Sequence, residues 1–180
     1  MTDSSAILVI LAGVAVIFVL LNEWTSGGQS GSSDQSSQQA IGTGIALGEQ
    51  PQFIIDTAQA IAVAEGYGVE GAIPTRANNP GDLTDVGQNF PGDTGQRIGQ
   101  NIIVFATPTD GWNALYAQIR LWLSGNSHVV NPTDSISIIA MKYAPDNPTA
   151  WAANVSAQLS AKGYNAGIDV PLNQIQMVTA

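Results

Sequence analysis

Residues 6–21 form a run of sixteen residues that contains no charged and no strongly polar side chain. As an α-helix this run would be about 24 Å long, slightly shorter than the hydrocarbon core of a bilayer. The flanking residues lengthen it to a spanning helix and place Trp24 where an interfacial aromatic side chain is expected. We therefore predict a single transmembrane anchor over residues 6–24, after an N-terminal tail of residues 1–5.

The alternative for this segment is a cleaved signal peptide. Residues 1–5 contain no Lys or Arg, and no clear small-x-small cleavage site follows the apolar run. Both features favour the anchor. Neither flank carries the excess of Lys and Arg that sets membrane orientation, so the orientation stays open.

The composition changes sharply after the apolar run. Thirteen of the fifteen residues from Thr25 to Gln39 are Ser, Gly or Gln. Such a segment buries too little apolar surface to offset the entropy lost on ordering. We predict a flexible linker over residues 25–50 and a folded domain over residues 51–180, where helical patterns and turn signals begin.

The charge balance excludes one class of partner, and the residue counts restrict the chemistry. Fourteen acidic and five basic residues give a net charge of −9, so a nucleic acid would find little to neutralise its phosphates. The chain has no cysteine, and His128 is its one histidine. A thiolate or multi-histidine metal site is thereby excluded, and we expect neither a metal nor a cofactor.

Apolar residues recur at helical spacing in four segments of the domain. The predicted helices begin at Pro51, at a Thr109 or Asp110 cap, at Asp134 and at Asn147-Pro148-Thr149, and end before Gly66, at Gly125, at Tyr143 and before Gly163. The only strand-like stretch is residues 101–105, and residues 66–99 read as a long loop with at most one small hairpin. The expected fold is mainly α, an α+β arrangement with a small β-hairpin region.

Glu65 is the strongest candidate for chemistry. It lies in the last turn of the first predicted helix, on the apolar stripe. Apolar surroundings and the C-terminal end of a helix both disfavour the charged carboxylate, so Glu65 would hold a proton near neutrality, as a general acid does. The alternative is a glutamate that extends into solvent at a helix end.

Several strings place Glu65 in a wider pattern: Ala64-Glu65-Gly66-Tyr67, GAIPTRANNPGDL at 71–83, IVF at 103–105 leading into PTDGW at 108–112, MKYAP at 141–145 and WAANV at 151–155. In this order they resemble a lysozyme-like family of phage and bacterial peptidoglycan-cleaving domains, which includes lytic transglycosylases and endolysins. The resemblance covers about residues 54–159. The string GYNAG at 163–167 imitates another motif of that superfamily, but it stands out of order and we interpret it as a coincidence.

The resemblance implies a two-lobed lysozyme-like fold whose cleft binds the peptidoglycan glycan strand. In single-glutamate members of the family, the carboxyl protonates the glycosidic oxygen and then acts as base on the muramic C6 hydroxyl, which closes an anhydro sugar. Glu65 would take that role. Asp82 and Asp85 are candidates for a hydrolytic partner, since two carboxyl groups on either side of a water give inverting hydrolysis. Their alternative role is hydrogen bonding to turn backbone.

Four further residues are expected near the substrate. Asn78 and Asn79 would hydrogen-bond acetamido groups, Arg76 would pair with a muramyl or peptide carboxylate, and Tyr143 would lie near the scissile bond. Each has a structural alternative: a turn for the asparagines, an intramolecular ion pair for Arg76, and helix packing for Tyr143.

These expectations combine into a membrane-anchored lytic transglycosylase that cleaves the β-1,4 bond between N-acetylmuramic acid and N-acetylglucosamine. The alternatives are a hydrolytic muramidase and an inactive structural or wall-binding virion component. The expected partners are the glycan strand, the lipid bilayer through residues 6–24 and, in a virion, other virion proteins. The expected location is the bacterial inner membrane facing the periplasm, or the internal membrane of a phage.

Overall fold

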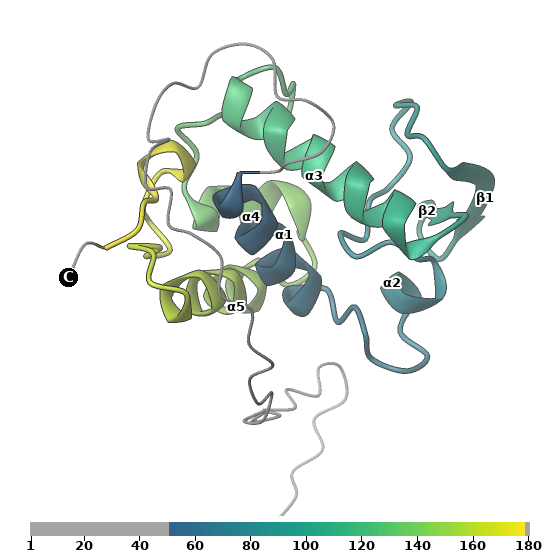
Figure 1. The fold of residues 1–180 in the computed structure, drawn as a ribbon, viewed down its shortest axis with the longest axis horizontal. Helices are drawn as coiled ribbons and strands as arrows, with labels where there is room; N and C mark the ends of the chain where they lie inside the picture. The colour runs from purple at the N-terminus through teal and green to yellow at the C-terminus, as the bar shows by residue number, and fades with distance from the viewer. Residues whose placement is uncertain (1–50, 179–180) are drawn as a thin grey trace, which may run out of the picture. The chain divides into compact units, whose positions relative to one another are not determined.

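Five α-helices and one two-stranded sheet make up the part of the chain that the structure, a computed structural model, describes, which is residues 51–178 (Figure 1). The helices are α1 (Gln52–Ala64), α2 (Ile73–Arg76), α3 (Pro108–Ser124), α4 (Ile136–Tyr143) and α5 (Pro148–Ala161), the strands are β1 (Asp93–Ile98) and β2 (Ile102–Phe105), and a 3-10 turn, η1, covers Leu172–Gln174. The expected α+β class is confirmed. The predicted anchor and linker lie outside the described residues, and none of the helices within 51–178 is long and apolar enough to cross a bilayer.

All four predicted helices are present, with small differences at their beginnings. The cap of α3 is Thr107 and not Thr109 or Asp110, because Pro108 fits the first helical position and Thr107 forms a capping box with Asp110. In α4 the cap is Ser135, whose side chain accepts from the amide of Ile138. Asp134, where that helix was expected to begin, instead accepts from Lys142 Nζ at 2.6 Å.

The segment between α1 and α3 is more ordered than a single loop. It contains α2 and the antiparallel β1–β2 hairpin, in which Arg97 pairs with Ile103 and Ile98 with Ile102. The hairpin confirms the small sheet. The helix α2 was not predicted, because four residues are too few to show helical periodicity.

Two groups of buried side chains form the core. The larger one joins α1, α3, α4 and α5, and the smaller one lies beneath the hairpin and contains Leu83, Ile103, Phe105 and Ala114. In Figure 1 the hairpin and α2 lie near the beginning of α3, apart from α4 and α5. The side chain of Tyr143 packs against both groups, so it marks the junction between the helical part and the hairpin part.

The C-terminal segment is attached to α1 through Asp56. This buried carboxylate accepts from Tyr164 Oη at 2.8 Å and pairs with Lys162 Nζ at 2.9 Å. Tyr164 belongs to the GYNAG string, whose role among the described residues is therefore to fix the chain end to the first helix.

Candidate active site

The end of α1 holds Glu65 in a fixed position. The amide of Gly66 bonds to the Val63 carbonyl at 3.1 Å, and the amide of Tyr67 bonds to the Ala62 carbonyl at 2.9 Å. These two bonds form a Schellman motif, which requires a left-handed residue after the cap, and Gly66 supplies it with φ +75°. Glu65 is thus the C-cap of the helix, and the chain turns away directly after it.

The carboxyl group of Glu65 is held inside the domain. Trp151, at the beginning of α5, donates from Nε1 to Glu65 Oε1 at 2.7 Å. The pKa of Glu65 is raised to about 7. Burial is the largest cause, the hydrogen bond from Trp151 acts in the opposite direction, and the charge of Asp82 adds to the increase. A large fraction of Glu65 is therefore protonated at neutral pH, the state that a general acid requires.

The loop after α2 is built around two asparagine amides. Asn79 has no exposed surface, and its Nδ2 donates to the carbonyls of Leu83 and Ile103, both at 2.9 Å, while its Oδ1 accepts from the amide of Leu83. Asn78 adopts φ +52° and donates from Nδ2 to the Phe105 carbonyl at 3.0 Å. Both side chains fasten the loop to β2. For Asn79 the expected contact with substrate is wrong, because its polar atoms are buried and already bonded.

The same loop places Asp82 close enough to Glu65 for its charge to raise the pKa of the Glu65 carboxyl. Asp82 adopts φ +50°, a conformation that costs energy for a residue with a side chain. Its Oδ1 is buried and accepts no hydrogen bond within residues 51–178. Burial raises the pKa of Asp82 to about 6. A strained, partly buried carboxyl without a partner is typical of a functional position, so Asp82 stays a candidate.

Tyr143 joins these groups from the last turn of α4. Its hydroxyl donates to the carbonyl of Gly81, and its ring packs between Trp122 and Trp151 at centroid distances of 5.3 and 5.5 Å. Burial and the charges of Glu65 and Asp82 raise its pKa. A Cβ at Gly81 would lie 2.7 Å from Leu115 Cδ1 and 3.0 Å from Tyr143 Oη, so a larger residue would have to displace these side chains. The structure thus brings Glu65, Asp82 and Tyr143 together.

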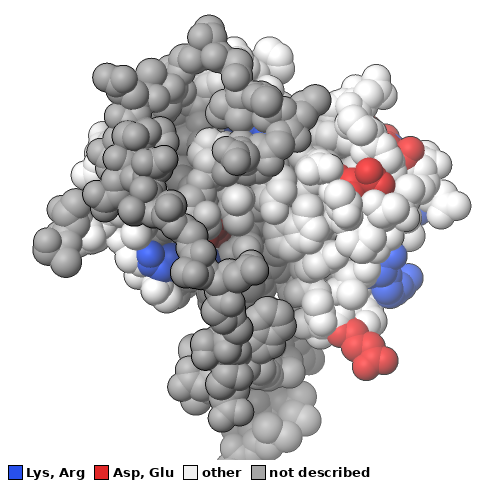
Figure 2. All heavy atoms as spheres, in the orientation of Figure 1, with Lys and Arg blue, Asp and Glu red and all other residues white. Residues whose placement is uncertain are grey.

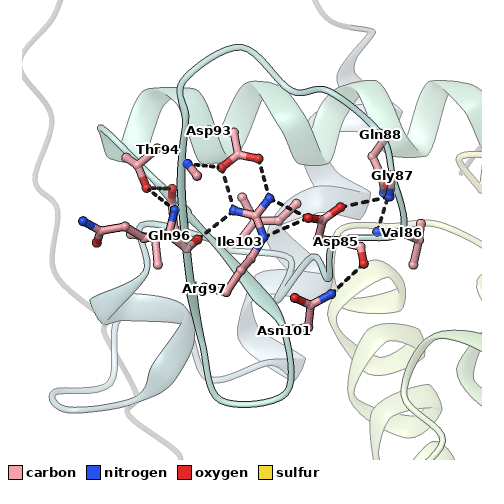
Figure 3. Close-up of polar contacts among 12 residues, drawn as sticks. Asp85, Val86, Gly87, Gln88, Asp93, Thr94, Gln96, Arg97, Asn101 and Ile103 are labelled. Atoms are coloured by element: carbon pink, nitrogen blue, oxygen red, sulfur yellow. Dashed lines mark hydrogen bonds and ion pairs between the residues drawn. The ribbon is translucent and has the colours of Figure 1, made fainter.

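Two predicted residues lie apart from this group. Asp85 pairs with Arg97 Nη2 at 2.7 Å, and Arg97 also pairs with Asp93 at 2.8 Å (Figure 3). The Gly87 amide and Arg97 hold the pKa of Asp85 below its usual range, so Asp85 fastens the loop to the hairpin and is a poor candidate for a catalytic base. Arg76 is exposed at the end of α2 and forms no ion pair within the described residues, which leaves its guanidinium open to a ligand.

An open pocket adjoins the group on the side of Asp82 and Tyr143. It lies between the loop before β1, the helix α3 and the end of α4, and the amides of Gln88 and Gln118 are among its polar walls. Asp82 and Lys142 are the charged residues of its lining. Elsewhere, most of the described surface drawn in Figure 2 is uncharged. Hydroxyl and acetamido groups of a neutral sugar fit such walls, since amides both donate and accept hydrogen bonds.

Trp151 is the residue that the sequence did not point to. In the sequence it belongs to the WAANV string within the fourth predicted helix, and the structure adds its hydrogen bond to Glu65. The available signal was its indole N–H, because a buried tryptophan usually finds an acceptor.

Comparisons with models of protein families, with curated proteins and with solved structures found no match to this chain. Within residues 51–178 no cluster of three or more His, Cys, Asp or Glu residues could hold a metal ion.

Proposed function

We propose that the chain is a peptidoglycan lytic transglycosylase of lysozyme-like fold, with Glu65 as its acid and base. The observation that carries the proposal is the partly buried Glu65 carboxyl, which accepts from Trp151 and whose pKa burial raises to about 7. A carboxyl that is protonated near neutrality can give a proton to a leaving oxygen and still be deprotonated afterwards.

The reaction needs one carboxyl and no water. Glu65 gives its proton to the glycosidic oxygen as the bond from that oxygen to the anomeric carbon of the muramic sugar breaks. The C6 hydroxyl oxygen then bonds to the anomeric carbon, and Glu65 takes the proton that this hydroxyl loses. The products are a free hydroxyl on one sugar and a 1,6-anhydro ring on the other, and Glu65 is protonated again.

Mass spectrometry of digested sacculi tests the proposal. A transglycosylase releases anhydro-muropeptides, which are lighter by one water than the products of hydrolysis. Reducing-end muropeptides would identify a muramidase instead, and the absence of release by a folded chain would contradict both enzymatic functions.

A hydrolytic muramidase is the second candidate, and Asp82 favours it. Its charge is close enough to raise the pKa of Glu65, so two carboxyl groups share the site. In that mechanism Asp82 would activate a water or stabilise the charged sugar, so substitution of Asp82 would strongly reduce the rate of cleavage.

Asp82→Asn separates the two mechanisms. For a transglycosylase we expect cleavage to fall by less than about tenfold, since no second carboxyl is needed. The alkaline limb of the rate profile should move to lower pH, because removing the Asp82 charge lowers the pKa of Glu65. Initial rates between pH 4 and 8 test this, with Asp85→Asn as the matched control on the same loop. A loss of several hundredfold in Asp82→Asn alone, with reducing-end products, would identify the muramidase.

We also propose that residues 6–24 anchor the enzyme in a membrane. The full-length chain is expected to partition into the detergent phase, while a chain beginning at Ala40 should stay in water and still cleave purified peptidoglycan. Phase separation of both chains measures this. A full-length chain with an intact N-terminus that stays in water without detergent would contradict the anchor.

A further inference from the structure

Trp151 contacts the carboxyl group of Glu65 through its indole N–H, which is the only hydrogen-bond donor of the side chain. The two residues lie 86 positions apart, and the indole Nε1 is 2.7 Å from Glu65 Oε1. Trp151 is 5% exposed, and its ring packs against Tyr143. Its own amide bonds to the carbonyl of Asn147 at 3.1 Å in the first turn of α5, which fixes the backbone that carries the ring.

This contact distinguishes the two oxygens of the carboxyl group. An indole nitrogen is a donor and never an acceptor, so Oε1 must present a lone pair to Trp151. In the protonated carboxyl the proton is then placed on Oε2. Within residues 51–178 no side chain or amide hydrogen-bonds to Oε2, which is therefore the oxygen open to a substrate.

We propose that Trp151 is a positioning residue that holds Oε1 of Glu65 and so makes Oε2 the oxygen that delivers the proton. This inference rests on the proposed function of Glu65. A proton that could reside on either oxygen would be aimed at the glycosidic bond in only part of the molecules. The hydrogen bond also strengthens after transfer, because Oε1 then carries part of the negative charge.

Three groups lie around Glu65 on different elements, and two of them, Trp151 and Asp82, shift its pKa. Trp151 on α5 is neutral, Asp82 in the loop after α2 is anionic when deprotonated, and Tyr143 on α4 stays neutral between pH 4 and 9, since burial and nearby charges raise its pKa further above that range. The Trp151 hydrogen bond lowers the pKa of Glu65, whereas burial and the charge of Asp82 raise it. Removing the donor should therefore raise that pKa and move the alkaline limb of activity to higher pH.

The test removes the N–H group and leaves the rest of the side chain. Trp151→Phe is the simple variant, and replacing Trp151 with benzothienylalanine keeps the bicyclic shape while sulfur takes the place of the N–H. Trp122→Phe is the matched control, since Trp122 is also buried and also packs against Tyr143 but donates nothing to Glu65. The full-length chain in detergent micelles is used throughout.

Two readouts separate this inference from the proposed function. The first is carbon-13 NMR of the glutamate carboxyl carbons. The chain has four glutamates, and the signal of Glu65 is identified as the one that is missing in Glu65→Gln. The second is the rate of glycan cleavage between pH 4 and 9. The NMR titration measures the hydrogen bond whether or not the chain cleaves peptidoglycan.

In both Trp151 variants we expect the Glu65 titration and the alkaline limb to move up together by about one pH unit, with kcat lower by about tenfold. The Trp122→Phe control should leave the titration of Glu65 in place. An unchanged titration and an unchanged kcat in the benzothienylalanine variant would overturn the inference. If the wild type cleaves no glycan, the proposed function fails and the positioning role fails with it, while a shifted titration would still support the hydrogen bond itself.

Discussion

Glu65→Gln should abolish glycan cleavage, with a loss of more than about a thousandfold, while the chain keeps its fold. Glutamine has nearly the same shape, and its carbonyl oxygen can still accept from Trp151. It has no proton to give to the glycosidic oxygen, and it cannot take one from the C6 hydroxyl. Both chemical steps depend on the same group, so a single substitution removes both.

Glu70→Gln is the matched control for this prediction. Glu70 lies five residues further along the chain, in the turn after α1, and it is exposed. Its substitution removes the same charge from the same neighbourhood of the sequence and should leave cleavage unchanged. Release of muropeptides from purified sacculi measures both variants. A folded Glu65→Gln chain that keeps more than a few per cent of wild-type activity would contradict the assignment of Glu65.

The position of Glu65 could be predicted because its signals are local. The apolar stripe of α1 directs the last turn inward, and Gly66 ends the helix at the next residue. The ends of the other helices follow from the same kind of signal, as Pro108 and Gly125 show for α3. Glycine and proline constrain the backbone directly, so their effect does not depend on distant residues.

The surroundings of Glu65 could not be predicted, because they depend on contacts between distant segments. Asn79 looked like a surface amide in a turn, and it became a buried one when β2 supplied the carbonyl of Ile103. Trp151 looked like an ordinary core residue, and its donor role needs α5 to lie beside the end of α1. In both cases the local sequence indicates the segment in which the residue lies but not its distant partner.

The two remaining carboxyl candidates, Asp82 and Asp85, illustrate the same limit. They are three residues apart in a loop rich in turn-forming residues, and the sequence did not separate them. Arg97, which lies on β1, engages Asp85 and leaves Asp82 with a buried oxygen that accepts no bond within the described residues. The pairing of one acid with a distant arginine thus decides which acid stays available for chemistry.

Glu65→Gln should also change how stability depends on pH. The pKa of Glu65 is about 7 in the folded chain against 4.5 for the ordinary carboxyl, so folding favours the protonated form. Between these two values the unfolded chain has lost the proton and the folded chain still holds it, so wild-type stability declines as pH rises. Glutamine cannot ionise and avoids this cost. The variant is therefore expected to be more stable than the wild type by on the order of 2 to 3 kcal/mol at pH 8, and equally stable near pH 4.

Urea unfolding of both chains from pH 4 to 8 measures this difference. The comparison between variants is needed because other carboxyls act in the opposite direction. Burial raises the pKa of Asp134, but hydrogen bonds from Lys142 and the Asn131 amide outweigh it, so its contribution to stability is lost as pH falls. That loss is common to both chains and cancels in the difference. A difference in unfolding free energy that stays constant from pH 4 to 8 would mean that Glu65 ionises as an exposed glutamate does, and it would remove the physical basis for its role as an acid.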